Sequence, residues 1–286
     1  MIQKIAVAGA GTMGSGIALS AAQNNFDVVL FDTNQKGIEQ AKLNIQKNVD
    51  FLLSKAKITI TEKEEIYSKI LFTTNINDCI ADVVIEAIIE NIAIKETLYK
   101  NLAAINSTNT ILASNTSSLS ITAIQKNIDV PSRVAGMHFF NPAHVMKLVE
   151  VVAGENTSQE TIQSLYNLCI QLKKQPVICK DAPGFIVNRV ARHYYLEAME
   201  LASTKNIGIE NIDAIMENVG FKMGPFKLMD LIGLDINYAV SQSVFESFHK
   251  NKRFAPAAMQ AEKVAAGNLG KKTGKGFYDY TLNPTT

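Results

Sequence analysis

Two strand-like segments each carry an ionisable residue where an apolar side chain would be expected. His138 interrupts the apolar segment Val134–Phe140, and Glu150 lies among aliphatic residues in Lys147–Val152. A carboxylate in such surroundings is costly unless it is paired. A short turn at Asn141-Pro142 joins the two segments, so the imidazole and the carboxylate could face each other. A histidine oriented by a carboxylate can serve as the general base in alcohol oxidation, whereas a lone histidine on a strand is more often a core residue.

A glycine-rich segment near the N-terminus has the spacing of a dinucleotide-binding turn. It contains Gly9, Gly11, Thr12, Met13 and Gly14, follows a short apolar run and opens a helical stretch. In this fingerprint the first glycine allows a tight turn, the second lets the backbone approach a pyrophosphate, and the third permits close helix–strand packing. A glycine-rich turn without a ligand is the alternative.

The end of the next apolar run indicates which dinucleotide would bind. Asp32 stands there, eighteen residues after Gly14. A carboxylate in this place can accept hydrogen bonds from both ribose hydroxyls and would repel a 2′-phosphate. No arginine precedes Arg133, so we predict NAD(H) rather than NADP.

Polar residues also follow two other predicted elements. The segment Ala113–Leu119 contains serines, an asparagine and a threonine at the end of a predicted parallel strand. Open α/β sheets bind ligands at such strand ends, although a polar turn that caps the next helix is equally consistent. Asn188 lies in the first turns of the helix after Pro183-Gly184, where it either caps that helix or reaches a cleft between domains.

Short apolar runs alternate with helical stretches through the first half of the chain. The predicted strands are Lys4–Ala10, Asp27–Asp32, Asp82–Ala87, Thr110–Asn115, Val134–Phe140, Lys147–Val152 and Gln175–Lys180. The predicted helices are Gly14–Asn24, Gln35–Ser54, Ile94–Ile105 and Ser158–Lys174. Consecutive apolar residues indicate strands buried on both faces, and the alternation is typical of a parallel sheet covered by helices. We therefore predict an α/β fold with a Rossmann-type, doubly wound, mostly parallel sheet.

After Ala182-Pro183-Gly184 the pattern becomes helical. The predicted helices cover Phe185–Thr204, Glu210–Val219, Gly233–Phe248 and Ala255–Ala266, with a strand at most in the last residues. The first of these is apolar on nearly every face, which is typical of a helix buried between a domain and a partner. We predict an NAD-binding domain over residues 1–184 and an all-α C-terminal domain over residues 185–286 for substrate binding and dimerisation.

The composition excludes several classes of protein. With 286 residues, 47% of them hydrophobic and 19% charged, the chain has the length of two domains and is not largely disordered. Its 28 basic and 27 acidic residues leave a net charge of +1, which argues against a nucleic-acid partner. No run approaches the ~20 apolar residues of a membrane span. The three cysteines have neither metal spacing nor an even count, so we expect a cytoplasmic protein without a metal site.

Five motifs occur in the order found in one enzyme family. They are Gly9-x-Gly-x-x-Gly14, Ser114–Leu119, His138–Pro142 with Met146–Glu150, Ala182–Arg189 and Met223–Phe226. Together they resemble the L-3-hydroxyacyl-CoA dehydrogenases of the short, stand-alone type, which include 3-hydroxybutyryl-CoA dehydrogenases. The resemblance runs through Lys272–Phe277 and covers essentially the whole chain.

The resemblance implies a reversible hydride transfer between NAD and C3 of an (S)-3-hydroxyacyl-CoA, with a 3-oxoacyl-CoA as the oxidised product. It implies that His138 is the base in oxidation and the acid in reduction, and that Glu150 supports its imidazolium. Ser117 and Asn188 would hydrogen-bond the reacting oxygen or the thioester carbonyl. The further residues that match cofactor contacts of the family are Glu90, Lys95, Asn141 and Lys272. Lys55 matches a lysine near the CoA phosphates, although a solvated surface lysine is equally consistent there.

Several alternatives remain within the resemblance. His144 stands where relatives commonly have proline, so it lines the site or is merely tolerated. A short-chain substrate such as 3-hydroxybutyryl-CoA, in butanoate or fatty-acid metabolism, is the first expectation. Segments 188–195 and 229–238 look closer to a branch that handles 3-hydroxyadipyl-CoA in aromatic-acid breakdown. Arg192 would then meet the distal carboxylate, although an interhelical ion pair is favoured.

The family also bears on assembly and on whether the chain is active. It implies a homodimer formed through the helical domain, whose apolar helices suggest a contact surface. The same family includes a catalytically silent, lens-type structural protein, so the fold alone does not establish activity. The presence of Ser117, His138, Glu150 and Asn188 together argues against a silent member.

Overall fold

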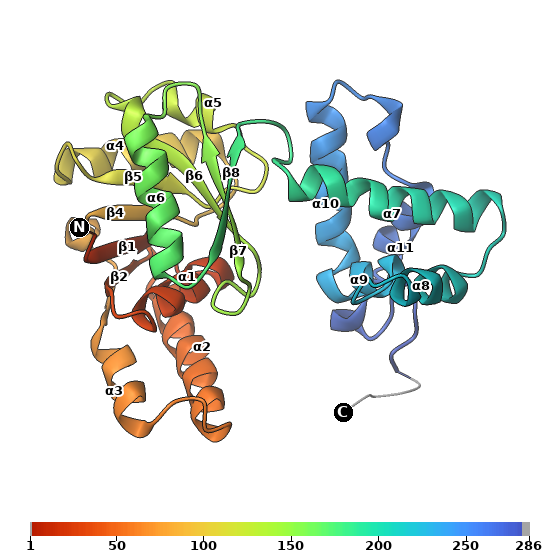
Figure 1. Cartoon of the computed structure of the whole chain (residues 1–286), viewed down its shortest axis with the longest axis horizontal. Helices are drawn as coiled ribbons and strands as arrows, with labels where there is room; N and C mark the ends of the chain where they lie inside the picture. The colour runs from red at the N-terminus through yellow and green to blue at the C-terminus, as the bar shows by residue number, and fades with distance from the viewer. Residues whose placement is uncertain (1, 282–286) are drawn as a thin grey trace. The chain divides into compact units, whose positions relative to one another are not determined.

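The computed structural model describes residues 2–281, and the chain divides into two compact units, Met1–Ala182 and Pro183–Thr286 (Figure 1). We call them the first unit and the helical unit. The chain passes from one to the other through Pro183, which lacks a backbone N–H, and through Gly184 and Phe185, both of which have a positive φ.

A single sheet of eight strands forms the centre of the first unit. The strands are β1 (Lys4–Ala8), β2 (Asp27–Phe31), β3 (Ile70–Thr73), β4 (Val83–Glu86), β5 (Ile111–Ser114), β6 (Val134–Phe139), β7 (Leu148–Ala153) and β8 (Gln175–Lys180). Their order is β3-β2-β1-β4-β5-β6-β7-β8, and every neighbouring pair is parallel except the antiparallel hairpin β6–β7. This confirms the predicted doubly wound, mostly parallel sheet. The strand order changes direction between β1 and β4, and open α/β sheets bind ligands at such a switch point.

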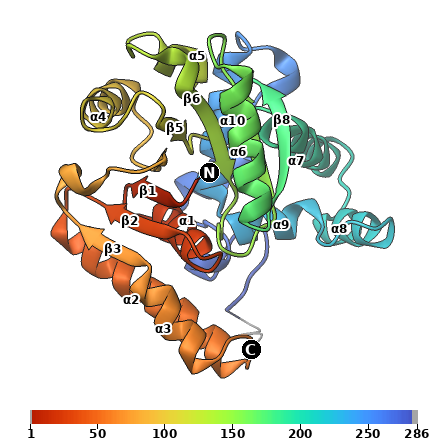
Figure 2. The ribbon, with the colours of Figure 1, turned by 60° about the vertical axis from the view of Figure 1, so that its left-hand side comes forward.

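Helices pack on this sheet as the alternating pattern predicts. They are α1 (Thr12–Ala22), α2 (Gln35–Ser54), α3 (Ile60–Ser68), α4 (Ile92–Ile105), α5 (Ile121–Gln125) and α6 (Gln159–Gln171). Helix α1 packs on β1 and β2, and α6 packs on β7 and β8. Helices α2 and α3 lie side by side beyond β2 and β3 (Figure 2). The bounds predicted for α2 are those observed.

The structure adds β3 and α3, which the sequence analysis missed. β3 is a four-residue edge strand with one buried residue, and its short apolar run, Ile70–Phe72, is a signal that the sequence analysis overlooked. α3 is mostly polar and buries only Ile66. Its one clear signal is a capping box, in which Thr59 Oγ1 accepts from the Glu62 amide and Glu62 accepts from the Thr59 amide.

The helical unit contains no named strand within residues 183–281. Its helices are α7 (Val187–Thr204), α8 (Ile209–Asn218), α9 (Pro225–Ile232), α10 (Leu234–Ser247) and α11 (Ala258–Ala265). Their core includes Tyr195, Met199, Phe226, Met229 and Leu234. The sequence analysis missed α9. It was also wrong to describe α7 as apolar on nearly every face, because only four residues of this helix are buried.

Two buried carboxylates stabilise the loops of the helical unit. Asp213 accepts hydrogen bonds from the amides of Phe226 and Lys227, at the start of α9, and from the Tyr278 hydroxyl. Asp230 accepts from the amides of Phe277 and Tyr278 and from the Tyr280 hydroxyl. These contacts connect α9 to the C-terminal segment, and they satisfy backbone donors that would otherwise be buried without partners.

Candidate active site

The glycine turn between β1 and α1 has the geometry that the fingerprint predicts. Gly9 has a φ of +108°, and a Cβ there would lie 2.5 Å from the carbonyl oxygen of Ala87. A Cβ on Gly14 would lie 1.7 Å from the carbonyl oxygen of Gly9. Gly11, by contrast, has nothing within 4 Å of its Cβ position. The two outer glycines are therefore required by packing, and the middle one leaves space for a ligand.

This space lies against the first turn of α1, which has features of an anion site. Gly11 is the N-cap residue and provides no side-chain cap, and the first turn contains no acidic residue. The amides of Thr12 and Met13 begin the helix at this point. Free amides and the positive end of the helix dipole favour a pyrophosphate here.

A pocket of about 590 Å³ opens beside the same turn. Its lining includes the apolar side chains of Ile76, Ile88 and Ile94, together with Asp32. Asp32 is already ordered, because its Oδ2 accepts a hydrogen bond from the amide of Ala10 at 2.8 Å. An apolar surface beside a fixed carboxylate suits an adenosine, whose ring needs apolar contact and whose ribose hydroxyls need an acceptor. These residues fit the dinucleotide that the sequence analysis predicts.

His138 and Glu150 occupy directly opposed positions of the β6–β7 hairpin. Glu150 Oε2 lies 2.8 Å from His138 Nδ1, and the residues are 1% and 6% exposed, respectively. The ring of Phe140 lies 4.5 Å from the imidazole, measured between ring centroids. The predicted juxtaposition is confirmed, and a carboxylate held on Nδ1 orients the ring for proton transfer at its other nitrogen.

The Ser114–Leu119 loop follows β5 and is bound to its neighbours on both sides. The Ser117 amide donates to Glu90 Oε1 at 3.2 Å, and the Ser118 hydroxyl donates to the same oxygen at 3.1 Å. On the β6 side, Asn115 Oδ1 accepts from the amide of Phe139 at 2.8 Å. The loop that carries Ser117 is therefore fixed next to the strand that carries His138.

Lys95 and Glu90 lie in a charged cluster that contains one residue the sequence analysis missed. Lys95 has no exposed side-chain area, and its Nζ lies 2.6 Å from Glu86 Oε1 and 3.1 Å from Glu90 Oε2. Burial opposes ionisation of Glu90, but the charge of Lys95 and the hydroxyls of Thr116 and Ser118 lower its pKa overall. Glu86 stands at the end of an apolar strand, and Glu150 stands within one. A carboxylate next to a run of apolar residues is the signal by which the sequence could have identified Glu86.

The remaining predicted site residues are more dispersed. Asn141 is exposed in the β6–β7 turn, and Lys55 is exposed at the end of α2, 5.8 Å from the ring of Phe51. In the helical unit, Asn188 is half-buried in the first turn of α7. Lys272 donates to both carboxylate oxygens of Asp235, at 2.6 and 2.7 Å, which lowers the pKa of Asp235.

Arg192 is a buried cation and makes no ion pair with any carboxylate of residues 2–281. It is 3% exposed, and its NH1 donates to the carbonyl oxygen and Oδ1 of Asn237 and to the hydroxyl of Ser241. Its Nε donates to the carbonyl oxygen of Asn188 at 3.2 Å. Burial lowers the pKa of Arg192 to about 10. The interhelical ion pair favoured by the sequence analysis is therefore wrong for this part of the chain.

His144 lies half-buried in the turn that joins β6 to β7. Burial lowers its pKa, and the charge of Lys174 lowers it further. Lys174 itself is 6% exposed and donates to the carbonyl oxygens of Ala143 and Met146, at 2.6 and 2.9 Å. The buried ammonium group of Lys174 thus stabilises the backbone of this turn.

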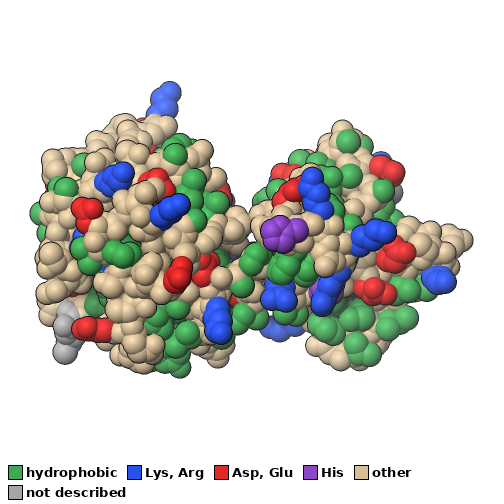
Figure 3. Space-filling model, turned by 90° about the horizontal axis from the view of Figure 1, so that it is seen from above, with side chains coloured by type: hydrophobic (Ala, Val, Ile, Leu, Met, Phe, Trp, Pro, Cys, Tyr) green, Lys and Arg blue, Asp and Glu red, His purple; other side chains and the backbone are tan. Residues whose placement is uncertain are grey.

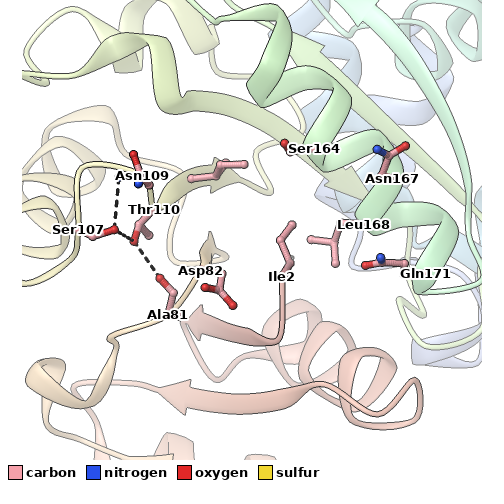
Figure 4. A pocket seen from close by; sticks show the side chains of 11 residues that line it. Ile2, Ala81, Asp82, Ser107, Asn109, Thr110, Ser164, Asn167, Leu168 and Gln171 are labelled. Atoms are coloured by element: carbon pink, nitrogen blue, oxygen red, sulfur yellow. Dashed lines mark hydrogen bonds between the residues drawn. The ribbon is translucent and has the colours of Figure 1, made fainter.

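A second pocket, of about 380 Å³, is lined by residues at the amino ends of β1, β4 and β5 (Figure 4). The glycine turn follows the carboxyl end of β1, at the opposite end of that strand. The carboxylate of Asp82 accepts there from the amides of Gln3 and Lys4, at 2.7 and 2.9 Å. The hydroxyl of Thr110 donates to the carbonyl oxygen of Ala81. These groups stabilise the starts of the strands, so the candidate site is at the other end of the sheet.

Other kinds of site were sought over residues 2–281. No three side chains of His, Cys, Asp or Glu are arranged there to hold a metal ion, and no helix in this range is long and apolar enough to cross a membrane. The three cysteines are free, and burial raises the pKa of each thiol to about 12. On the face drawn in Figure 3, basic and acidic side chains are interspersed.

Comparison with known proteins matches both units. The family model described as "3-hydroxyacyl-CoA dehydrogenase, NAD binding domain" matches residues 4–182, and "3-hydroxyacyl-CoA dehydrogenase, C-terminal domain" matches residues 184–280. Among curated proteins, the chain is 45% identical to 3-hydroxyadipyl-CoA dehydrogenase of Escherichia coli, over 98% of this chain and 59% of that protein. The chain therefore spans less than two thirds of that relative.

Two further proteins are similar over nearly all of this chain. The 3-hydroxybutyryl-CoA dehydrogenase of Clostridioides difficile is 40% identical over 97% of this chain and 99% of its own length. The crystal structure of 3-hydroxybutyryl-CoA dehydrogenase from Escherichia coli has a TM-score of 0.96 and 44% identity, covering 100% of this chain and 61% of that one. With both family models matched and the NAD-binding turn in place, the chain belongs to the 3-hydroxyacyl-CoA dehydrogenase family.

Proposed function

We propose that this chain catalyses the reversible, NAD-dependent oxidation of (S)-3-hydroxyacyl-CoA to 3-oxoacyl-CoA. The observation that carries the proposal is the buried pair in which Glu150 Oε2 lies 2.8 Å from His138 Nδ1. The carboxylate fixes the orientation of the imidazole and stabilises its protonated form. Proton exchange with the substrate then takes place at Nε2, the ring nitrogen on the opposite side from Glu150.

The proton and the hydride leave the substrate for different acceptors. When bound, NAD supplies the acceptor for the hydride that leaves C3. His138 Nε2 takes the hydroxyl proton as the C3–O bond becomes a carbonyl, and it returns the proton in reduction. Glu150 stays bound to Nδ1 and stabilises the imidazolium that forms.

Two polar side chains complete the proposed site. Ser117 and Asn188 donate hydrogen bonds to the reacting oxygen or to the thioester carbonyl, where negative charge develops. Gly9, Gly11, Thr12, Met13, Gly14 and Asp32 hold the coenzyme, together with Glu90, Lys95, Asn141 and Lys272. Lys55 binds the phosphates of CoA.

The preferred substrate in this proposal is a short-chain 3-hydroxyacyl-CoA. Identity of 40% to the 3-hydroxybutyryl-CoA dehydrogenase of Clostridioides difficile, over nearly the full length of both proteins, supports this choice. The second candidate is 3-hydroxyadipyl-CoA, supported by 45% identity to the Escherichia coli relative of that name. The burial of Arg192, with its donors directed to Asn188, Asn237 and Ser241, argues that this arginine does not bind the distal carboxylate.

The test is the initial rate of NADH oxidation by the purified protein with acetoacetyl-CoA and, in parallel, with 3-oxoadipyl-CoA. A saturable rate that is faster with acetoacetyl-CoA supports the first candidate, and a rate that is faster with 3-oxoadipyl-CoA supports the second. Absence of a rate with either compound, from protein that binds NADH, would contradict the proposed activity and support a catalytically silent relative.

We also propose a homodimer formed through the helical unit. Large aliphatic side chains of this unit, among them Val219, Leu231 and Ile236, are 67%, 52% and 52% exposed, and a second copy of the helical unit would cover them. Light scattering should give the mass of a dimer for the wild type and of a monomer for Leu231→Asp/Ile236→Asp. Leu71→Asp is the matched control, because Leu71 is also 52% exposed but lies on β3. A monomeric wild type would contradict the proposal.

A cytoplasmic location is the remaining part of the proposal. The three free, buried cysteines suit a reducing compartment, where thiols persist without pairing. Fractionation of cells that express the tagged chain checks this, and recovery outside the cytoplasmic fraction would contradict it.

A further inference from the structure

Glu86 is a fully buried carboxylate at the end of β4, and the proposed reaction does not use it. Its side chain has no exposed area. Oε1 accepts from the amide of Ile88 at 2.7 Å and from Lys95 Nζ at 2.6 Å, and Oε2 accepts from the Ser114 hydroxyl at 2.7 Å. A buried charge is tolerated when it is paired and hydrogen-bonded in this way, but well-packed apolar side chains would often be at least as stable.

One route from Glu86 to the Ser114–Leu119 loop is direct. The Ser114 hydroxyl, which donates to Glu86, accepts a hydrogen bond from the amide of Thr116 at 3.2 Å. The Thr116 hydroxyl in turn accepts from the amides of Ser118 and Leu119, at 3.2 and 2.8 Å. Glu86 therefore orients the Ser114 hydroxyl, and that hydroxyl stabilises the first turn of the loop.

A second route passes through charged side chains. Lys95, held by Glu86, places its Nζ 3.1 Å from Glu90 Oε2. The other oxygen of Glu90 accepts from the Ser117 amide, from the Ser118 hydroxyl and, by a short contact, from the Thr116 hydroxyl. Each carboxylate oxygen of Glu86 thus leads to the loop that carries Ser117, by a different set of bonds.

We propose that Glu86 is a positioning residue that fixes Ser117 for the reaction, through Ser114 on one side and through Lys95 and Glu90 on the other. The inference rests on the proposed function, because it assigns Ser117 to the substrate. Glu86 itself touches neither substrate nor coenzyme in this account. Its effect is to keep the loop in one conformation, since small displacements of a substrate-binding group lower turnover strongly.

The first experiment compares Glu86→Gln with Asp27→Asn, a matched loss of one carboxylate from an exposed ion pair with Lys69 in the same unit. Hydrogen exchange of the amides of residues 116–119 should become at least about tenfold faster in Glu86→Gln, while those of β4 stay protected. The kcat with the preferred 3-oxoacyl-CoA should fall at least about tenfold. Asp27→Asn should leave both measurements unchanged.

The second experiment separates positioning from simple stabilisation. Glu86→Gln/Lys95→Met removes one negative and one positive charge, so its thermal stability should recover relative to Glu86→Gln. Its kcat, measured at saturating NADH so that any loss of coenzyme contact by Lys95 is compensated, should stay low, because Glu90 has lost its lysine and the loop remains unanchored. Recovery of kcat together with stability would overturn the proposal.

Ser114→Ala provides the test if the charge variants fail to fold. It removes only the direct route and leaves Glu86, Lys95 and Glu90 intact, so the protein should fold. Faster exchange at Thr116 with a reduced kcat is expected, and an unchanged exchange rate and kcat would overturn the inference. A wild type without dehydrogenase activity would instead contradict the proposed function, while the exchange measurements would still test the network.

Discussion

The coenzyme edge of the first unit and the helical unit neutralise their buried charges by different means. At the coenzyme edge of the first unit, formed by residues 9–14, 86–90, 114–119 and 138–141, charged side chains are paired with side chains of opposite sign. His138 is paired with Glu150, and Lys95 is paired with Glu86 and Glu90. In the helical unit, Asp213 and Asp230 accept from backbone amides and tyrosine hydroxyls, and Arg192 donates to carbonyl, amide and hydroxyl oxygens.

This difference indicates what each set of charges does. A paired charge at a ligand site can change its protonation or its partner during a reaction, because the partner side chain stabilises both arrangements. A carboxylate surrounded by amides acts as a fixed cross-link between segments of backbone. Substitutions at the coenzyme edge should therefore affect turnover more than stability, and substitutions in the helical unit should do the reverse.

The largest effect is expected for Glu150→Gln. The amide cannot stabilise the imidazolium of His138, so kcat should fall about 100-fold. The Kd of NADH, measured by fluorescence, should change little because Asp32 and the glycine turn are intact. Asp50→Asn, in a half-buried pair with Lys63 on α2 and α3, is the control. Unchanged turnover in Glu150→Gln would remove the basis for the proposed role of the pair.

Asp230→Asn, in the helical unit, should reduce stability more than it reduces NADH binding. The amide group cannot accept from all of its present donors, which are the amides of Phe277 and Tyr278 and the Tyr280 hydroxyl. The free energy of unfolding in urea should fall by about 3 kcal/mol. NADH affinity should stay near the wild-type value. Glu246→Gln, in the exposed pair with Lys250, should be nearly neutral, and an equally small effect in both variants would contradict the comparison.

Arg192→Met tests the buried cation of the helical unit. The methionine loses the hydrogen bonds to Asn237 and Ser241 but also relieves the desolvation that lowers the pKa of the guanidinium to about 10. The free energy of unfolding should therefore fall by only about 1–2 kcal/mol. The ratio of kcat/KM for 3-oxoadipyl-CoA to that for acetoacetyl-CoA should not change. A large loss of kcat/KM with 3-oxoadipyl-CoA alone would show that Arg192 binds the distal carboxylate.

Lys174 is a buried cation of the first unit that lies outside the coenzyme edge, and it is bound by the carbonyl oxygens of Ala143 and Met146. It shows how a buried charge without a partner of opposite sign depends on pH. Burial and then the charge of Lys147 lower its pKa from 10.5 to about 8, with a small opposing effect of Cys169. The unfolded chain therefore binds this proton more tightly than the folded chain does. The cost of burying the charge is full below pH 8 and disappears as the pH rises towards 10.5.

The stability of the wild type should therefore rise with pH relative to a variant that lacks Lys174. Between pH 7 and pH 10, the wild type should gain on the order of 1 kcal/mol of stability relative to Lys174→Met, measured by urea unfolding at each pH. Subtracting the variant removes the groups whose titration does not depend on Lys174. His144, whose pKa is lowered by burial and by the charge of Lys174, titrates below this pH range. Lys100→Met, at an exposed position on α4 that does not affect the pKa of Lys174, should keep the wild-type pH dependence. A constant difference between wild type and Lys174→Met would contradict the assignment.

Much of the fold and part of the site could be predicted from the sequence. Central strands such as β1 and β4 are continuous apolar runs, and α2 has a clear amphipathic pattern. The pairing of His138 with Glu150 could be predicted because both lie on one hairpin, so strand periodicity and a short turn suffice. Gly9, Gly14 and Asp32 could be assigned because their roles depend on backbone geometry at a known motif.

The elements that were missed depend on tertiary contacts. α3 is too polar to show a pattern, and β3 offers only the short apolar run Ile70–Phe72. The place of each is set by packing on α2 and β2. The bonds from Glu86 to Ser114 and Lys95 join segments 28 and 9 residues away, across a parallel crossover and a helix. No local pattern specifies such contacts. For the same reason Arg192 was misassigned, since its partners on α10 lie more than 40 residues along the chain.

The β6–β7 hairpin has a consequence for how the sequence can vary in length. Because His138 and Glu150 are directly opposed, inserting or deleting one residue in the hairpin turn would shift the register and move one of them to the other face of the sheet. Surface turns usually tolerate such changes, and Pro142, Val145 and Met146 are exposed. This turn should nevertheless be invariant in length in every active member, while the α2–α3 connection should accept insertions freely.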